Sequence, residues 1–337
     1  MMNVGLVDVD GHNFPNLALM KLSAWHKRNG DNVEWCIPLC RYDRIYKVKV
    51  FDEVYTQDDN LWLQAKEVVK GGTGYFRQKR NENNEIYNEI YHNGKWENIG
   101  DKTEVKRDDE IYRKELPFDV EHIYPDYSLY PKLTKDTAFG FLTRGCPRNC
   151  KFCIVGCKEG LKSVKVADLE EFWKDQKKIK LLDPNLLACR EHIDLLEQLD
   201  SSKAYVDFTQ GLDIRMTTKR NIELINNIKV KEIHFAWDNP KDKLENKFMR
   251  YAERAKHKPH GKFGTVYVLT NFGTTMEENL HRIYTLRDMN FDPYVMIYNK
   301  PTAPREIRLL QRWCNNRIIF RSCEKFEDYD PKIGRKE

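Results

Sequence analysis

The C-terminal part of the chain alternates between short apolar stretches and longer amphipathic ones, and this alternation limits the fold most. The apolar stretches have the length and the β-branched and aromatic content of buried strands; they cover residues 137–143, 178–183, 204–208, 231–237, 264–270 and 293–298. The stretches between and after them have the apolar spacing of helices; they cover residues 166–176, 190–199, 218–228, 244–256, 275–289 and 304–316. Six strand-then-helix units predict an α/β protein with a parallel sheet and helices outside it, either open or curled into a partial barrel.

Length and charge set only broad limits on function. The chain has 337 residues, which suffices for one large domain and a smaller one. Its 57 basic and 52 acidic residues give a net charge of +5, which permits a polyanionic partner without requiring one. No apolar run of signal-peptide type follows Met1, and no stretch approaches the ~20 apolar residues of a membrane span. We therefore expect a cytoplasmic protein with no membrane partner.

Four of the nine cysteines lie in the stretch FLTRGCPRNCKFCIVGC, at the end of the first predicted strand; they are Cys146, Cys150, Cys153 and Cys157. In a reducing compartment, crowded thiols hold a metal more often than they form disulfides. A structural zinc site usually takes two of its ligands from a distant second pair. Three thiolates close together in one loop suit a four-iron cluster that leaves one iron open. An open iron can bind the amino and carboxylate groups of a molecule and pass it an electron.

This spacing resembles the signature of the radical S-adenosylmethionine superfamily, Cys-x3-Cys-x-aromatic-Cys. Cys146, Cys150, Phe152 and Cys153 match it, and Cys157 lies outside it as a spare thiol. The resemblance covers residues 117–322 and implies a six-unit (β/α)6 partial TIM-type barrel with a [4Fe-4S] cluster on the three cysteines. It also implies reductive cleavage of S-adenosylmethionine to a 5′-deoxyadenosyl radical, with flavodoxin or ferredoxin as electron donor. A zinc site or a ferredoxin-like cluster is the alternative.

Polar residues follow the predicted strands, at the edge where the chemistry of such folds gathers. The candidates for cofactor binding, besides Phe152, are Asp183, Asn185, Gln210, Asp213, Arg215, Asp238, Asn271 and Asn299. The family often carries a Gly-rich motif after the second strand, and its glycines are absent here, so Asp183 and Asn185 are positional stand-ins. The resemblance implies that Arg215 clamps a carboxylate and Asp213 accepts from ribose hydroxyls. The structural alternatives are helix caps and a salt-bridged turn.

Residues 1–74 read as a small Rossmann-like βα domain: a strand in 3–10, a helix in 14–30, a second strand in 32–39 and a glycine turn near 71–75. The unit resembles an abbreviated cobalamin-binding domain. Asp10-Gly11-His12 fits the Asp-x-His-x-x-Gly pattern of domains that ligate cobalt, but Pro15 stands where the last glycine belongs. A structural or docking role is therefore favoured over cobalamin binding. Cys36 and Cys40 are expected to be buried small residues rather than cluster ligands.

Residues 75–116 are highly charged and predict an inserted hairpin, or else a solvated linker. The hairpin signal is Asn-Gly between two strand-like runs within 85–100. Residues 117–322 form the predicted barrel, and 323–337 a C-terminal tail.

Three functions remain open from the sequence. The first is radical modification of a nucleic-acid base or nucleotide, of methyl or methylthio type, with Arg305, Arg308 and Arg312 on one helical face and the Lys-rich stretch 241–262 as a phosphate-binding surface. A merely solvated helix face is the alternative for these charges. The second is radical modification of a peptide or small metabolite, with the 75–116 segment as a lid. The third is a non-enzymatic, zinc-stapled binding module.

Overall fold

The computed structural model describes residues 1–58 and 63–332. Residues 59–62 of the predicted N-terminal domain and 333–337 of the predicted tail therefore lie outside the described residues. The chain divides into two compact units. The N-terminal unit comprises residues 1–149, 153–161 and 166–179, and the C-terminal unit comprises 150–152, 162–165 and residues from 180 onwards.

The N-terminal unit is built on a mixed six-stranded sheet in the order β2-β1-β3-β4-β9-β8. The strands are β1 (Asn3–Asp8), β2 (Asn32–Trp35), β3 (Arg41–Val48), β4 (Gln64–Gly71), β8 (Glu104–Arg107) and β9 (Glu110–Arg113). All neighbours are parallel except β8 and β9. Helix α1 (Leu17–Arg28) connects β1 to β2, so the predicted βαβ start is confirmed. Its residues Leu19 and Leu22 pack in one core cluster with Val4 and Leu6 of β1.

A second, antiparallel sheet of this unit contains β5 (Phe76–Arg80), β6 (Ile86–His92) and β7 (Lys95–Gly100). The predicted hairpin is confirmed as β6 and β7. Asn93 and Gly94 between them have φ values of 48° and 79°, the left-handed pair that a tight two-residue turn requires. Strand β5, the third strand of this sheet, was not predicted. Residues 104–113, which we assigned to the hairpin region, instead form β8 and β9 of the mixed sheet.

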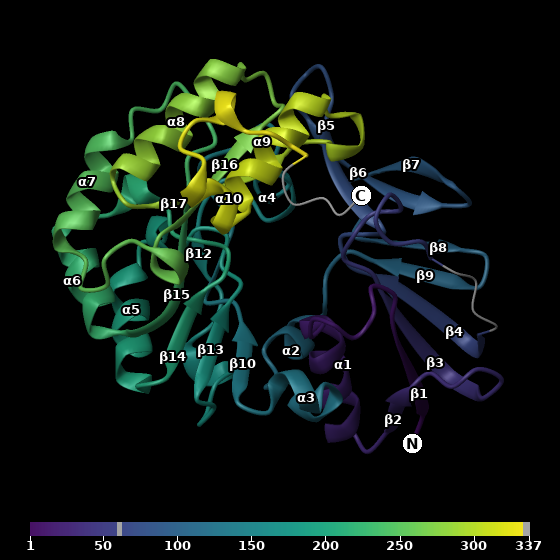
Figure 1. Ribbon diagram of the computed structural model, residues 1–337. Coiled ribbons are helices and arrows are strands. Elements are labelled where there is room, and N and C mark those ends of the chain that lie inside the picture. Colours follow the sequence, from purple (N-terminus) through teal and green to yellow (C-terminus); the bar gives the residue numbers. More distant parts are fainter. Residues whose placement is uncertain (59–62, 333–337) are drawn as a thin grey trace. The chain divides into compact units, whose positions relative to one another are not determined.

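The other six-stranded sheet is parallel and has its strands in chain order, β10-β13-β14-β15-β16-β17. They are β10 (Thr137–Gly140), β13 (Lys178–Leu181), β14 (Tyr205–Phe208), β15 (Lys229–Ala236), β16 (Thr265–Thr270) and β17 (Asp292–Ile297). All six predicted strands are thus confirmed, and with them the α/β class and the parallel sheet. Helices α5 to α8 lie along one side of the sheet (Figure 1).

Five of the six predicted helices of this set are confirmed: α5 (His192–Ser202), α6 (Lys219–Asn227), α7 (Glu245–Arg254), α8 (Met276–Asp288) and α9 (Arg305–Asn315). The first, predicted over 166–176, is wrong. That stretch holds only a 3-10 turn, Leu169–Glu171. The Tyr127 hydroxyl donates to the Phe172 carbonyl at 2.6 Å, so this stretch is tied to a distant part of the chain rather than ordered by its own helical hydrogen bonds alone.

Short elements complete the chain. They are α2 (Phe118–Glu121), α3 (Pro131–Thr134), β11 (Thr143–Arg144), α4 (Val155–Lys158), β12 (Val164–Lys165), α10 (Arg317–Ser322) and the 3-10 turns Tyr127–Leu129, Leu186–Ala188, Ile214–Met216, Gly261–Phe263, Lys300–Thr302 and Phe326–Asp328. Among the helices of the described residues, none has the length and apolar character needed to cross a membrane.

The two faces of the parallel sheet differ in character. Phe235 of β15 packs edge-on against Tyr251 of α7 at 4.7 Å between ring centroids, so its side of the sheet faces the helices. Side chains alternate along a strand, which turns Glu232 and His234 to the opposite face. Asp207 and Tyr267 lie beside these two residues on that face.

Candidate active site

The cysteine-bearing loop begins directly after β11. Its first residues are held by hydrogen bonds to the residues that follow α4. The amide of Cys146 donates to the carbonyl of Gly160 at 3.1 Å. The amide of Gly145 and the guanidinium of Arg144 both donate to the carboxylate of Glu159, at 3.2 and 3.3 Å. These contacts hold the first cysteine beside the end of α4, within the N-terminal unit.

The signature cysteines differ from Cys157 in their local structure. Cys146, Cys150 and Cys153 lie in irregular chain and are partly buried. Cys157 lies within α4, where its amide donates to the carbonyl of Ile154 at 3.1 Å. The three signature cysteines thus share one loop without regular secondary structure, whereas Cys157 belongs to a helical turn.

Phe152, the aromatic residue of the signature, lies at the carboxyl edge of the parallel sheet. Its ring meets that of Phe272 edge-on at 5.5 Å, and Phe272 meets Tyr298 at 4.8 Å. Phe272 follows β16 and Tyr298 follows β17. Phe152 is thus placed where the predicted strand-end residues were expected.

Three of the predicted polar residues are joined in one network after β13 and β14. The side-chain amide of Asn185 donates to Asp213 at 3.2 Å, and the Arg215 Nε donates to the other Asp213 oxygen at 2.6 Å. Arg215 also donates to Asp242 at 2.8 Å. Burial lowers the pKa of Arg215, but its hydrogen bonds and charge pairing with Asp213 and Asp242 outweigh this, so the pKa is raised. The geometry includes the salt-bridged turn considered above as the structural alternative.

The other predicted residues have varied surroundings. Asp183 is buried after β13, and Gln210 is exposed in the turn after β14. Asn271 and Asn299 have φ values of 63° and 47°, a left-handed conformation that asparagine tolerates. Asn271 also donates to the Tyr298 carbonyl at 2.8 Å. These two asparagines therefore shape the loops after β16 and β17.

Asp238, at the end of β15, is the acid whose ionisation the fold changes most clearly. Burial raises the pKa of its carboxyl to about 6, although the charges of Arg282 and Arg215 act in the opposite direction. The group is therefore able to hold or release a proton near neutral pH.

Asp238→Asn should make the protein's stability less dependent on pH. A carboxyl whose folded pKa lies above its ordinary 3.8 favours folding below pH 3.8, and this contribution is lost as the pH rises through about 6. Relative to wild type, the variant's free energy of unfolding should rise by about 2 kcal/mol between pH 4 and pH 7. Urea unfolding at both pH values measures this difference. An equal difference between the two proteins at both pH values would show that Asp238 titrates normally.

Sequence reasoning missed Arg282 of α8, a fully buried cation beside this site. Its guanidinium donates to the carbonyls of Trp237 and Leu269, at 2.7 and 3.0 Å, and so joins the ends of β15 and β16. Burial lowers its pKa to about 10, which leaves it charged at neutral pH. Helical spacing marked α8 as amphipathic, but nothing in the sequence signals that one of its arginines points inward.

The N-terminal candidates have structural partners. Asp10 accepts from the amides of Val50 and Phe51, at 2.5 and 3.3 Å, and the His12 ring stacks on Trp35 at 4.1 Å. Cys36 is partly buried, and burial raises the pKa of its thiol. Cys40 is exposed, so its predicted burial is wrong. It lies in the turn between β2 and β3, where a side chain has little to pack against.

The chain matches no protein-family model, and a search of curated proteins finds no match either.

Proposed function

We propose that this protein is a radical S-adenosylmethionine enzyme whose parallel sheet forms a (β/α)6 partial barrel. The observation that carries the proposal is the Cys-x3-Cys-x-Phe-Cys spacing at the end of the first strand of a six-stranded parallel sheet built in chain order. Thiolates are the natural ligands of a [4Fe-4S] cluster. Cys146, Cys150 and Cys153 fit that cluster because they share one irregular loop and are only partly buried.

A [4Fe-4S] cluster held by Cys146, Cys150 and Cys153 would supply the chemistry: with one electron from a flavodoxin or ferredoxin, it would cleave a carbon–sulfur bond of S-adenosylmethionine to give methionine and a 5′-deoxyadenosyl radical. The chain's own residues bind and orient. Phe152 offers an aromatic face beside Phe272. Asn185 and Asp213 present amide and carboxylate groups that suit an ammonium or hydroxyl partner. Asp238 holds or releases a proton at its carboxyl, because its pKa is about 6.

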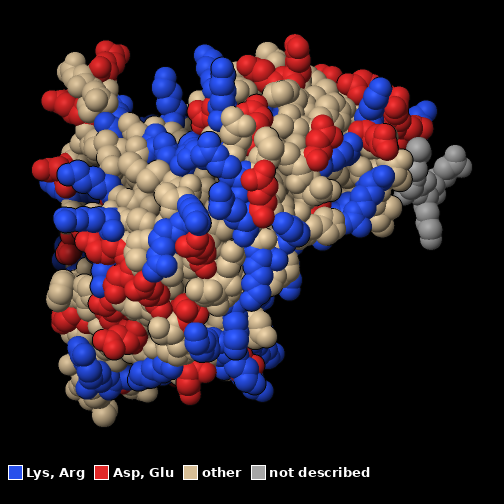
Figure 2. Space-filling view, turned by 90° about the vertical axis from the view of Figure 1, so that its left-hand side faces the viewer, with Lys and Arg blue, Asp and Glu red and all other residues tan. Residues whose placement is uncertain are grey.

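The substrate class is the less constrained part of the proposal. A nucleic-acid base or nucleotide, modified by a methyl- or methylthio-type transfer, is our first candidate. Two of the three α9 arginines already bond within the protein, because Arg308 and Arg312 donate to the carbonyls of Pro301 and Pro331, at 2.9 and 3.0 Å. Figure 2 shows Lys and Arg intermixed with Asp and Glu on the face it displays. That mixture favours a peptide or small metabolite as the second candidate.

Anaerobic reconstitution tests the proposal. Protein given iron, sulfide, S-adenosylmethionine and dithionite should turn brown and form 5′-deoxyadenosine, and S-adenosylhomocysteine in addition would indicate methyl transfer. Parallel reactions with RNA and with a peptide mixture compare the substrate classes by stimulation of product formation. A colourless protein that retains zinc and forms no 5′-deoxyadenosine would instead support the zinc-stapled binding module.

A further inference from the structure

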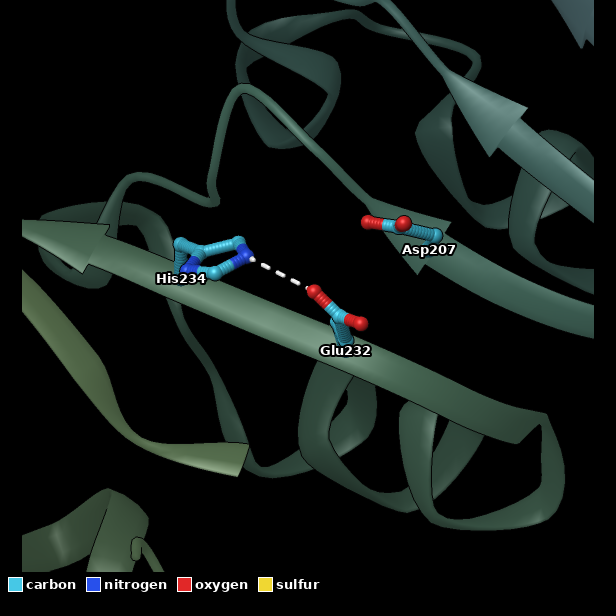
Figure 3. A group of neighbouring side chains, drawn as sticks. All are labelled: Asp207, Glu232 and His234. Carbon is cyan, nitrogen blue, oxygen red and sulfur yellow. Dashed lines mark ion pairs between the residues drawn. The ribbon is translucent and has the colours of Figure 1, made fainter. Parts of the chain in front are cut away.

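Asp207, Glu232 and His234 form a compact group on two neighbouring strands of the parallel sheet. Asp207 of β14 is paired in register with Glu232 of β15, and His234 follows two residues later on the same face. One side-chain donor atom from each lies within 4.8 Å of the other two. Figure 3 shows the three side chains rising from the same side of the two strands.

The three side chains of this group differ in their exposure to solvent. The Asp207 side chain is 4% exposed, that of His234 14% and that of Glu232 36%. The site is therefore enclosed at Asp207 and open at Glu232, which leaves an entry path for a small ion.

The facing donor atoms are not used up by short hydrogen bonds. Asp207 Oδ1 accepts from the Thr209 hydroxyl at 3.1 Å, while Oδ2 has lysine ammonium groups no nearer than 3.6 Å. The His234 Nε2 lies 3.7 Å from Glu232. These separations exceed ordinary hydrogen-bond lengths, so the facing donor atoms have room for an ion between them.

We propose that Asp207, Glu232 and His234 bind a divalent first-row transition cation, separate from the cysteine loop. Two carboxylates and an imidazole are ligands that Zn²⁺, Fe²⁺ and Mn²⁺ accept, with water in the remaining positions. Donor atoms about 2.1 Å from a tetrahedral ion lie about 3.4 Å apart. Small side-chain rotations would bring the three donor atoms from their present separations to that spacing. Thr209 on Asp207 and the Tyr267 ring, stacked on His234 at 5.5 Å, orient two of the ligands.

Two lysine side chains lie beside the carboxylates of this group. The ammonium groups of Lys180 and Lys231 both lie 3.6 Å from Asp207 Oδ2, and Lys231 lies 3.7 Å from Glu232. They offset the carboxylate charges when no cation is bound, and a divalent cation competes with them. Removing one lysine should therefore strengthen cation binding, which a purely structural salt-bridge network would not do.

Mn²⁺ titration of the full-length protein, followed by electron paramagnetic resonance, tests the site. Mn²⁺ prefers oxygen and nitrogen ligands over thiolates, so the cysteine loop does not compete. One Mn²⁺ per chain should bind. Asp207→Asn and His234→Gln should each weaken binding at least about tenfold. Glu223→Gln, an exposed carboxylate of α6, should leave it unchanged.

Lys231→Met supplies the opposite test, since it should tighten Mn²⁺ binding several-fold. It keeps the proposal falsifiable if a ligand variant fails to fold, which circular dichroism of each variant would show. Absence of Mn²⁺ binding at millimolar concentration in both wild type and Lys231→Met would overturn the proposal. So would equal affinity in wild type and folded His234→Gln. Neither result depends on radical chemistry, so the proposed function stands or falls separately.

Discussion

Replacing any one of Cys146, Cys150 and Cys153 with alanine should reduce 5′-deoxyadenosine formation to the level seen without enzyme. Each thiolate would hold a different iron of the proposed cubane, so losing one would leave a second iron without a protein ligand. Iron and sulfide retained after anaerobic reconstitution should fall together with activity. Iron analysis, visible absorption and product chromatography of each variant provide the three measurements.

Cys157→Ala is the matched control, because it removes a thiol from the same stretch without touching the signature. Cys157 lies in α4 and not in irregular chain, so the variant should keep both iron and activity. If Cys157→Ala lost iron as completely as the other three, the site would be a closed four-thiolate one, and the open iron on which the proposed reaction depends would not exist.

Arg282→Met should lower the free energy of unfolding by about 3–5 kcal/mol. Besides the carbonyls of Trp237 and Leu269, the guanidinium donates to the Asp238 carbonyl at 2.8 Å and the Asn279 side chain at 2.6 Å. Methionine fills the volume but leaves these acceptors buried without donors. Arg282→Lys should recover little, because an ammonium group cannot reproduce the planar fork that reaches two strands at once.

Urea unfolding followed by circular dichroism measures this effect at neutral pH. Arg220→Lys is the control: Arg220 is exposed and pairs with Glu197 at 3.2 Å, and the change should cost under about 1 kcal/mol. If Arg282→Lys were as stable as the control, the bonds to the strand ends would contribute little and the burial of Arg282 would need another reason.

The strands of the parallel sheet could be predicted because each is a local signal. A stretch such as 264–270 is apolar and rich in β-branched residues, and neither property depends on its neighbours. The failed helix at 166–176 shows the limit of this reasoning. Its amphipathic spacing is real, but Tyr127 takes the Phe172 carbonyl, and a contact across 45 residues leaves no trace in the local pattern.

The same limit applies to the candidate site. The cysteine spacing is contained in a few residues, so the sequence displays it whole. Asp213 and Arg215 are also neighbours in sequence, which is why a salt-bridged turn is one of the structures that the sequence predicts there. Asp207 and His234 come together only through the register of β14 with β15, and an alternation of polar and apolar residues along β15 is the one signal that points to them.

The chain-ordered arrangement of the parallel sheet bears on how the protein forms during synthesis. Each new strand from β14 onwards pairs with the one completed just before it, so the growing chain closes only short loops at each of these steps. The mixed sheet differs, since β4 and β9 pair across about 40 residues that include a complete antiparallel sheet. On a ribosome, the later half of this protein can assemble as it emerges, whereas the earlier half must wait for β9.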